Sequence, residues 1–256
     1  MTDFIYTNNP ARIIFGAGSV QRVAEEVKAL GCQRALLLST PFQREDAERL
    51  TDALGGLSVG VFSRATMHTP VQVTDEAMRT YLELGADCVV AIGGGSTIGL
   101  GKAIAYRNDA PQVVVPTTYA GSEVTPILGQ TENGIKTTVS SPSILPEVVI
   151  YDPELTLGLP VPMSITSALN AMAHAVEALY ARNRNPITSL MAVEGIRALK
   201  EALPAVVQQP TSIAPRSTAL YGSWLCGTVL GTVGMALHHK VCHTPVSYTH
   251  LRAHET

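Results

Sequence analysis

The most informative stretch of this sequence is Val89-Val90-Ala91-Ile92-Gly93-Gly94-Gly95-Ser96-Thr97-Ile98-Gly99-Leu100-Gly101-Lys102. An apolar run leads into three glycines, a hydroxyl side chain and a helix-like stretch, which predicts a strand, a tight turn and a helix. Because glycine has no Cβ, a phosphate can come close to the backbone at Gly93, Gly94 and Gly95. The N–H groups that open the following helix, near Ser96, would point towards that phosphate. The spacing differs from G-x-G-x-x-G, because Ile98 occupies the place of the third glycine.

A second loop of the same kind follows closely. It reads Val113-Val114-Val115-Pro116-Thr117-Thr118-Tyr119-Ala120-Gly121-Ser122-Glu123, again a strand-like run that enters a polar turn. Ordinary tight turns are the simpler explanation of the three glycines taken alone. Two neighbouring strands that both end in such loops instead predict a nucleotide site at the carboxyl edge of a parallel sheet.

Strand-like and helix-like segments alternate up to about Asp152, which predicts an α/β half with a parallel sheet covered on both faces. The expected strands are 35–38, 59–62, 88–92, 112–115 and 148–150, and the expected helices are 19–30, 45–54 and 73–84. Residues 131–146 are expected to form a loop or a short hairpin, because glycine and proline interrupt the pattern there.

Beyond Asp152-Pro153 the strand pattern ends and helical spacing takes over. Helices are expected at 164–181, 187–203 and 215–241, with Ser164 and Asn185-Pro186 as their N-terminal signals. The sequence therefore predicts an α/β dinucleotide-binding domain over residues 1–157 and a helical substrate domain over residues 158–243.

Composition excludes several classes of protein. Hydrophobic residues make up 46% and charged residues 15% of the 256 residues, and the net charge is −3. This balance argues against nucleic-acid binding, which usually needs a basic face. Cysteines without C-x-x-C spacing and an N-terminus without a secretion signal predict a cytoplasmic protein with reduced thiols. Residues 219–237 carry no charge, yet their hydroxyl and aromatic side chains favour a buried core helix over a membrane span.

Histidines in the helical half occur at helical spacing. Asn170 and His174 stand four residues apart on one apolar helix, and His239 and His243 repeat that spacing at the end of another. Two ligands one turn apart can hold a metal ion, whereas a hydrogen-bonded core histidine is the alternative explanation of either residue alone. Asn170 weakens the case for a metal, because a neutral amide is a much poorer ligand than a carboxylate.

The sequence resembles the iron-containing alcohol dehydrogenase superfamily from about Phe15 to His243. The resemblance rests on the glycine loop, on Pro116-Thr117-Thr118 and on the helix with a polar residue four positions before His174. Longer matching strings cover 95–102, 117–123, 151–156 and 170–177. The resemblance implies a dehydroquinate synthase-like fold, in which an α/β half is followed by an all-α domain, here incomplete at the C-terminus.

The same resemblance implies NADH as the cofactor. The loop from Gly93 to Ser96 is expected at the pyrophosphate, with Thr117 and Thr118 along the adenosine or ribose. Ser39 follows the expected strand 35–38, at a position where relatives that strongly prefer NAD carry an acidic residue. Because a serine does not repel a 2′-phosphate, NADPH is also expected to be accepted.

Departures from the metal-dependent members imply a reductase that needs no bound metal. Those members carry Asp where this chain has Gly99 and Asn170. His174 and His239 match their ligand positions and are expected to face the substrate here, or to hold a metal if one is present. His243 matches a histidine near the nicotinamide and is the expected proton donor.

The implied reaction is the reduction of the carbon–carbon double bond of maleylacetate to 3-oxoadipate, in aromatic-compound degradation. Charge that develops on the conjugated carbonyl needs donors, for which His239, Lys240, His243 and Tyr119 are the candidates. Lys240 or Arg182 would bind the dicarboxylate. The resemblance also implies a homodimer for the full-length protein, with neither nucleic acid nor membrane as a partner.

Residues 244–256 depart from the superfamily pattern and resemble a translated adapter fragment, so we expect a non-native tail and set aside His250 and His254. Three functions then compete. The first is the reductase, the second is a metal-dependent alcohol or polyol dehydrogenase, and the third is a nucleotide-binding fragment without activity. Metal that is lost on chelation would indicate the second, and NADH binding without turnover would indicate the third.

Overall fold

The structure is a computed structural model, and it describes Phe4, Tyr6 and residues 11–234. The chain divides into two compact units. The sheet unit consists of Ala11–Thr117 and Pro126–Leu155. The helical unit contains Thr118–Thr125 and the described residues from Thr156 onwards. The second of the two polar loops therefore changes unit between Thr117 and Thr118.

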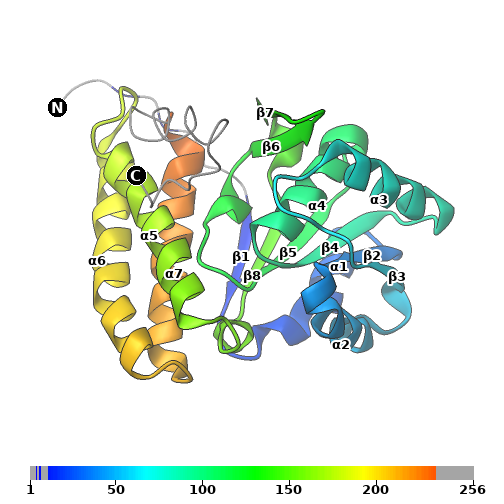
Figure 1. Cartoon of the computed structure of the whole chain (residues 1–256), viewed down its shortest axis with the longest axis horizontal. Coiled ribbons are helices and arrows are strands. Elements are labelled where there is room, and N and C mark those ends of the chain that lie inside the picture. The colour runs from blue at the N-terminus through cyan, green and yellow to red at the C-terminus, as the bar shows by residue number, and fades with distance from the viewer. Residues whose placement is uncertain (1–3, 5, 7–10, 235–256) are drawn as a thin grey trace. The chain divides into compact units, whose positions relative to one another are not determined.

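The sheet unit is built on one six-stranded sheet in the order β1-β8-β5-β4-β2-β3, with every neighbouring pair parallel (Figure 1). The strands are β1 (Arg12–Phe15), β2 (Ala35–Leu38), β3 (Ser58–Phe62), β4 (Cys88–Gly93), β5 (Gln112–Pro116) and β8 (Val148–Tyr151). The predicted parallel sheet is confirmed. The edge strand β1 was not among the expected strands, because its four residues are too few to make a long apolar run.

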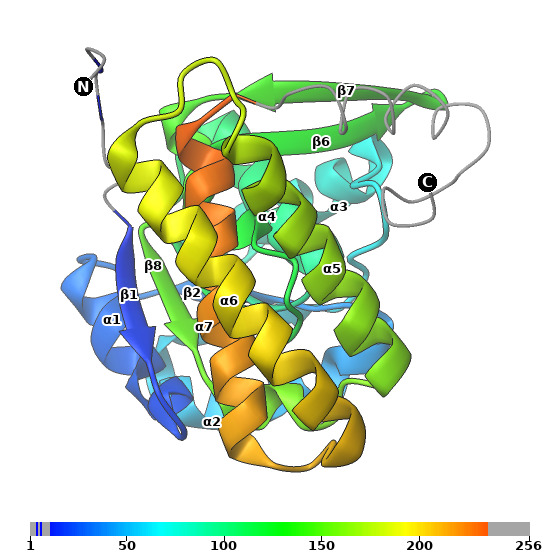
Figure 2. The same cartoon turned by 90° about the vertical axis from the view of Figure 1, so that its left-hand side faces the viewer.

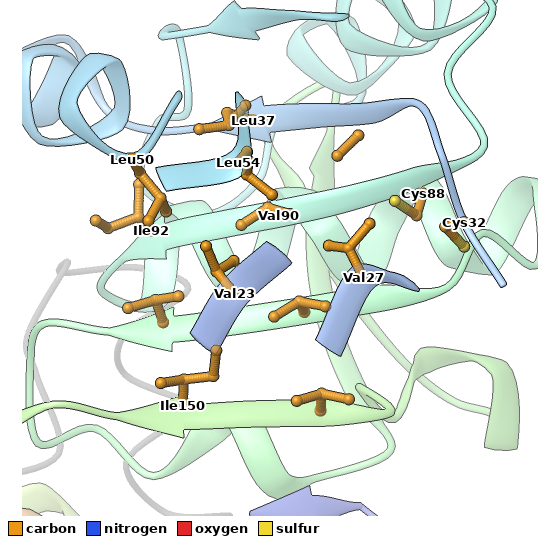
Figure 3. Close-up of a cluster of buried hydrophobic side chains, with 14 of the residues drawn as sticks. Val23, Val27, Cys32, Leu37, Leu50, Leu54, Cys88, Val90, Ile92 and Ile150 are labelled. Carbon is orange, nitrogen blue, oxygen red and sulfur yellow. The ribbon is translucent and has the colours of Figure 1, made fainter. Parts of the chain in front are cut away.

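Helices cover both faces of this sheet. Helices α1 (Val23–Ala29) and α2 (Arg44–Leu54) pack on one face, and α3 (Val71–Glu83) and α4 (Gly95–Asn108) pack on the other. Along β2, Leu37 joins the core of the first face, whereas Leu36 and Leu38 join the core of the second. This alternation follows from the two-residue period of a strand. Figure 3 shows the first core, with Val23 and Leu50 against the strands.

The segment predicted as a loop or short hairpin forms a hairpin. Strands β6 (Ile127–Glu132) and β7 (Ile135–Ser140) pair antiparallel across a turn at Asn133 and Gly134, both with positive φ. Short 3₁₀ helices make several connections: η1 (Ser19–Arg22), η2 (Pro41–Gln43), η3 (Gly55–Leu57), η4 (Ser122–Val124), η5 (Pro142–Ile144) and η6 (Pro153–Thr156).

The helical unit contains α5 (Val161–Ala178), α6 (Pro186–Gln208) and α7 (Ile213–Thr232), which pack on one another (Figure 2). Asn185 caps α6 as predicted, because its Oδ1 accepts from the N–H groups of Ile187 and Thr188 at 3.0 Å each. Ser164 as the N-terminal signal of α5 was wrong. The helix begins earlier, after Pro160, and the Ser164 hydroxyl donates back to the Pro160 carbonyl at 3.1 Å.

Helix α7 ends at Thr232, so the expected continuation to residue 241 is wrong where the structure describes it. Val233 has extended backbone angles, and the Gly234 N–H donates to Asn183 Oδ1 at 3.0 Å. The β-branched pair Thr232 and Val233, followed by a glycine, has weak helix propensity. Over the described residues, no helix is both long enough and apolar enough to span a membrane.

Candidate nucleotide-binding site

The sheet changes the direction of its connections between two neighbouring strands, β2 and β4. The chain leaves β2 for α2 on one face of the sheet, and it leaves β4 for α4 on the other face. In open α/β sheets, ligands bind outside the carboxyl ends of the strands at such a point. The first glycine loop, which the sequence predicts to hold phosphate, begins at this point.

At two positions of the glycine loop, the surroundings show what a side chain would meet there. Gly93 ends β4 with φ +151°, and a Cβ there would lie 2.5 Å from Thr97 Oγ1 and 2.8 Å from Gln43 Oε1. A Cβ at Gly95 would meet no atom within 4 Å, so there is open space at the first turn of α4. That turn holds no acidic residue. A helix N-terminus with free space and no acidic residue in its first turn is suited to an anion.

The second loop reaches the first through Thr117. The Thr117 N–H donates to the Gly93 carbonyl at 3.0 Å, and β5 lies directly beside β4, as the sequence predicts. Gln43, at the end of η2, donates from Nε2 to Thr117 Oγ1 at 2.8 Å. The structure therefore brings together the ends of β2, β4 and β5 within the sheet unit.

Ser39 lies at the carboxyl end of β2 and is fully buried. Its N–H donates to the Phe62 carbonyl at 3.1 Å, and its carbonyl accepts from the Ala65 N–H at 3.0 Å. The Ser39 hydroxyl has no hydrogen-bond partner among the residues that the structure describes. A buried polar atom without a hydrogen-bond partner lowers the stability of a protein by about 1–3 kcal/mol. A ligand that formed a hydrogen bond with the Ser39 hydroxyl would remove this penalty and so bind more tightly.

Lack of space within the sheet unit explains why position 99 is a glycine. A Cβ on Gly99 would collide with Thr69 Oγ1. His68 and Thr69 have positive φ of 66° and 46°, which is unusual for residues with a side chain. An aspartate at position 99 would therefore require this turn to move.

Tyr119 belongs to the helical unit and is fully buried. Its hydroxyl accepts from Arg216 Nη1 and donates to Thr156 Oγ1, both at 3.2 Å. Its carbonyl accepts from the Ser223 hydroxyl at 2.6 Å. These contacts anchor the loop, and they favour a positioning role for Tyr119 over the predicted role of donor to the substrate, which stays a prediction.

Arg216 is the centre of this network and is fully buried. Besides Tyr119, it donates to the Ser164 hydroxyl at 2.8 Å, to the Pro210 carbonyl at 2.9 Å and to the Leu159 carbonyl at 3.0 Å. All four acceptors are neutral, and within residues 11–234 no carboxylate pairs with Arg216 in a salt bridge. The guanidinium satisfies polar groups of three separate segments at once.

The predicted histidine site is only partly described. Asn170 and His174 both lie on α5, where His174 is 8% exposed. His239, Lys240 and His243 lie outside the described residues. Among the described His, Cys, Asp and Glu side chains, His174 belongs to no group of three that could hold one metal ion.

The one such group in the described part of the chain is Cys32, Asp87 and Cys88, whose ligand atoms lie within 4.8 Å of one another. It is at the amino ends of β2 and β4, the opposite edge from the glycine loop. Burial raises the pKa of the Cys88 thiol, and it also raises the pKa of Cys32. Cys32 Sγ also contacts the carbonyl oxygens of Leu30 at 3.8 Å and Asp87 at 4.0 Å.

Sequence reasoning missed Gln43 and Arg216, although each left a signal. Gln43 follows an expected strand by a few residues, and the carboxyl ends of all strands share one edge. Arg216 is the sole charged residue of the otherwise uncharged helix α7. A lone arginine in an apolar helix indicates a buried cation that needs several acceptors.

Taken together, the strand order and the glycine loop define an α/β unit of the dinucleotide-binding class, joined to a helical unit. The chain belongs to the iron-containing alcohol dehydrogenase family. The family model "Iron-containing alcohol dehydrogenase" matches residues 10–153, and "Fe-containing alcohol dehydrogenase family, C-terminal" matches residues 164–254. The second match runs into the segment predicted to be a non-native tail, and it gives no support to a break at residue 244.

Several relatives of this chain share the name maleylacetate reductase. The chain is 69% identical to maleylacetate reductase of Rhizobium sp. (strain MTP-10005) over 95% of its own length and 70% of that protein. It is 56% identical to maleylacetate reductase of Burkholderia cepacia, over 95% of the chain and 69% of the relative. The crystal structure of maleylacetate reductase from Agrobacterium tumefaciens superimposes with a TM-score of 0.97 at 67% identity, covering 99% of this chain and 72% of that one.

These comparisons confirm the predicted superfamily and the predicted fold, a parallel α/β half followed by helices. They do not support the expectation that no metal is required, because the family is described as iron-containing. The site residues expected from the sequence are not tested by them.

Proposed function

We propose that the chain is an NAD(P)H-dependent oxidoreductase that reduces the carbon–carbon double bond of maleylacetate to give 3-oxoadipate. The observation that carries this proposal is the 69% identity to a maleylacetate reductase over 244 residues. The glycine loop at the β2/β4 switch point supports it independently, because the reaction needs a bound dinucleotide.

The cofactor is proposed to lie along the carboxyl edge of the sheet. Gly94, Gly95 and Ser96 would hold the pyrophosphate, because open space at Gly95 coincides with the N-terminus of α4. Thr117 would contact the ribose or a phosphate from the neighbouring strand, and Thr118 follows it. The first turn of α4 carries no carboxylate that would repel the pyrophosphate.

In the proposed reaction, NADH, when bound, would supply a hydride to the alkene carbon β to the ketone carbonyl, and the alkene electrons would pass to the carbonyl oxygen as an enolate. The chain must then stabilise the enolate and protonate its α-carbon. This proton completes the saturated product. We assign the proton to His243 and the stabilising contacts to His239 and Lys240, all predicted from the sequence and outside the described residues. The described contacts of Tyr119 support a role in holding its loop.

We further propose that this reaction proceeds without a bound metal. The described donors at the predicted ligand positions are the neutral amide of Asn170 and the imidazole of His174, and neither supplies negative charge. A homodimer and a cytoplasmic location are proposed with the same function.

The first expected result is oxidation of NADH in the presence of maleylacetate, with a rate that survives chelation. The measurement follows NADH absorbance at pH 7 before and after treatment with a chelator, together with the metal content of the protein. Asn170→Asp is the matched variant, because it supplies an anionic ligand and should raise the bound metal. Turnover that chelation abolishes would instead indicate the metal-dependent dehydrogenase, and NADH binding without turnover would indicate an inactive nucleotide-binding chain.

A second expected result concerns NADPH, which differs from NADH by a 2′-phosphate on the adenosine ribose. We expect NADPH to support turnover, because Ser39 carries no charge at the end of β2. Introducing a carboxylate with Ser39→Asp should lower kcat/KM for NADPH at least about tenfold more than for NADH, since like charges close together repel strongly. Both cofactors are assayed at equal concentration, with Ser39→Ala as the uncharged control. Equal losses for the two cofactors would show that Ser39 does not face the 2′ position.

A further inference from the structure

We propose that Gln43 is a positioning residue for the dinucleotide, because it holds the Thr117 hydroxyl in the orientation that donates to the nucleotide. The inference rests on the proposed function and adds to it a residue outside both glycine-and-hydroxyl loops. Every contact that carries it lies within the sheet unit.

The first observation is the direction of the hydrogen bond. Gln43 Nε2 donates to Thr117 Oγ1 at 2.8 Å, so one lone pair of that oxygen is occupied by a donor. The Thr40 hydroxyl approaches Gln43 Oε1 at 3.4 Å, which is consistent with the amide nitrogen facing Thr117. A threonine hydroxyl has one hydrogen of its own. With the acceptor side engaged, that hydrogen is available for an oxygen acceptor of a ligand.

The second observation is the position of this pair. Gln43 Oε1 and Thr97 Oγ1 both lie against Gly93, where a Cβ would meet them at 2.8 Å and 2.5 Å. Thr97 Oγ1 is buried and has no hydrogen-bond partner among the described residues. The Thr117 N–H is fixed at the same place by the Gly93 carbonyl, at 3.0 Å. The Thr117 N–H is thus already paired, and the buried hydroxyl of Thr97 beside it is the group that points to a missing oxygen-rich partner.

The third observation is the topology. Gln43 ends η2, the connection that leaves β2, whereas Thr97 lies in the first turn of α4, which leaves β4. These two connections diverge to opposite faces of the sheet. Gln43 is therefore the side chain that crosses the switch point, from the end of β2 to the end of β5.

The test is a double-mutant cycle on NADH binding. Gln43→Leu and Thr117→Val are each expected to raise the Kd for NADH about tenfold, the size expected for one hydrogen bond to a charged or strongly polar acceptor. The double variant should be no weaker than the weaker single variant, because both changes remove the same contact. Thr117→Ser keeps the hydroxyl and should bind as the wild type does. The loss should be larger in kcat/KM for NADH than in kcat measured at saturating NADH, because the lost contact is to the cofactor.

Gln33→Leu is the matched control, since Gln33 is an exposed glutamine just before β2, at the opposite edge of the same sheet. ADP and adenosine serve as further probes. A loss confined to ADP would identify a phosphate oxygen as the acceptor, and a loss for both would identify a ribose oxygen.

Two results would overturn the inference: unchanged NADH binding in Gln43→Leu, or losses that multiply in the double variant. Failure of the wild-type protein to bind NADH would instead overturn the proposed function, and with it this role of Gln43. The thermal unfolding midpoint of each variant separates a local effect on binding from loss of the fold.

Discussion

Arg216→Ala is expected to lower the free energy of unfolding by roughly 3–5 kcal/mol, the largest effect we predict for a single side chain. The substitution removes four hydrogen bonds, of which those to Tyr119 and Ser164 are buried and those to Leu159 and Pro210 are partly buried, and it leaves these acceptors without their donor. It also leaves a cavity, because the side chain is fully buried. Denaturant unfolding of the purified variant measures the change.

The matched control is Arg197→Ala on α6. Arg197 makes ion pairs with Glu194 and Glu201 at 2.7 Å and 2.6 Å, yet its side chain is 52% exposed. Exposed pairs contribute about 0–1 kcal/mol, so this control should unfold nearly as the wild type does. If the two alanine variants were equally stable, the central role of Arg216 in the helical unit would be wrong.

Gly227→Ala is expected to destabilise the protein by roughly 1–3 kcal/mol, or more if the backbone cannot move. Helix propensity alone predicts the opposite sign, since alanine in a helix interior is better than glycine by about 1 kcal/mol. The structure reverses that sign, because a Cβ on Gly227 would collide with the backbone carbonyl of Gly121. Gly121 itself has φ +75°, so its loop has little freedom to retreat.

This prediction is checked by thermal unfolding together with the KM for NADH. Displacement of the loop that carries Thr118 and Gly121 should weaken cofactor binding as well as stability. Gly158→Ala is the control, because a Cβ there would meet no atom within 4 Å. A Gly227→Ala variant more stable than the wild type would mean that the close approach of the two backbones is not maintained in solution.

Arg216→Ala and Gly227→Ala both test how the loop that contains Tyr119 and Gly121 is held in the helical unit. Ser223 and Arg216 hold the loop through hydrogen bonds, and Gly227 permits it to approach α7. The G-x-x-x-G spacing in α7, which in a membrane would indicate helix pairing, therefore has a local explanation at its first glycine. Residues 219–232 of the uncharged segment belong to a packed helix of the helical unit, as the sequence predicts.

Much of the sheet unit could be predicted because its signals are local. Apolar runs gave the inner strands, and the glycine loop gave the start of α4, since both depend on neighbouring residues. The adjacency of β4 and β5 also followed, because consecutive strand–helix–strand units usually lie side by side. Strand β1 and the true end of α7 were missed, since a four-residue edge strand and a helix end carry weak signals.

Local signals in the sequence were sufficient to predict the family, the parallel α/β half, the glycine turn from Gly93 to Ser96 and the cap at Asn185. Each is encoded by residues close together in the chain, so backbone preference and periodicity are sufficient. The contact of Gln43 with Thr117 and that of Arg216 with Tyr119 join residues 74 and 97 positions apart, so they emerge only in the folded chain. Such contacts depend on strand order and on the side chains that remain without partners after packing, and neither is a local property of the chain.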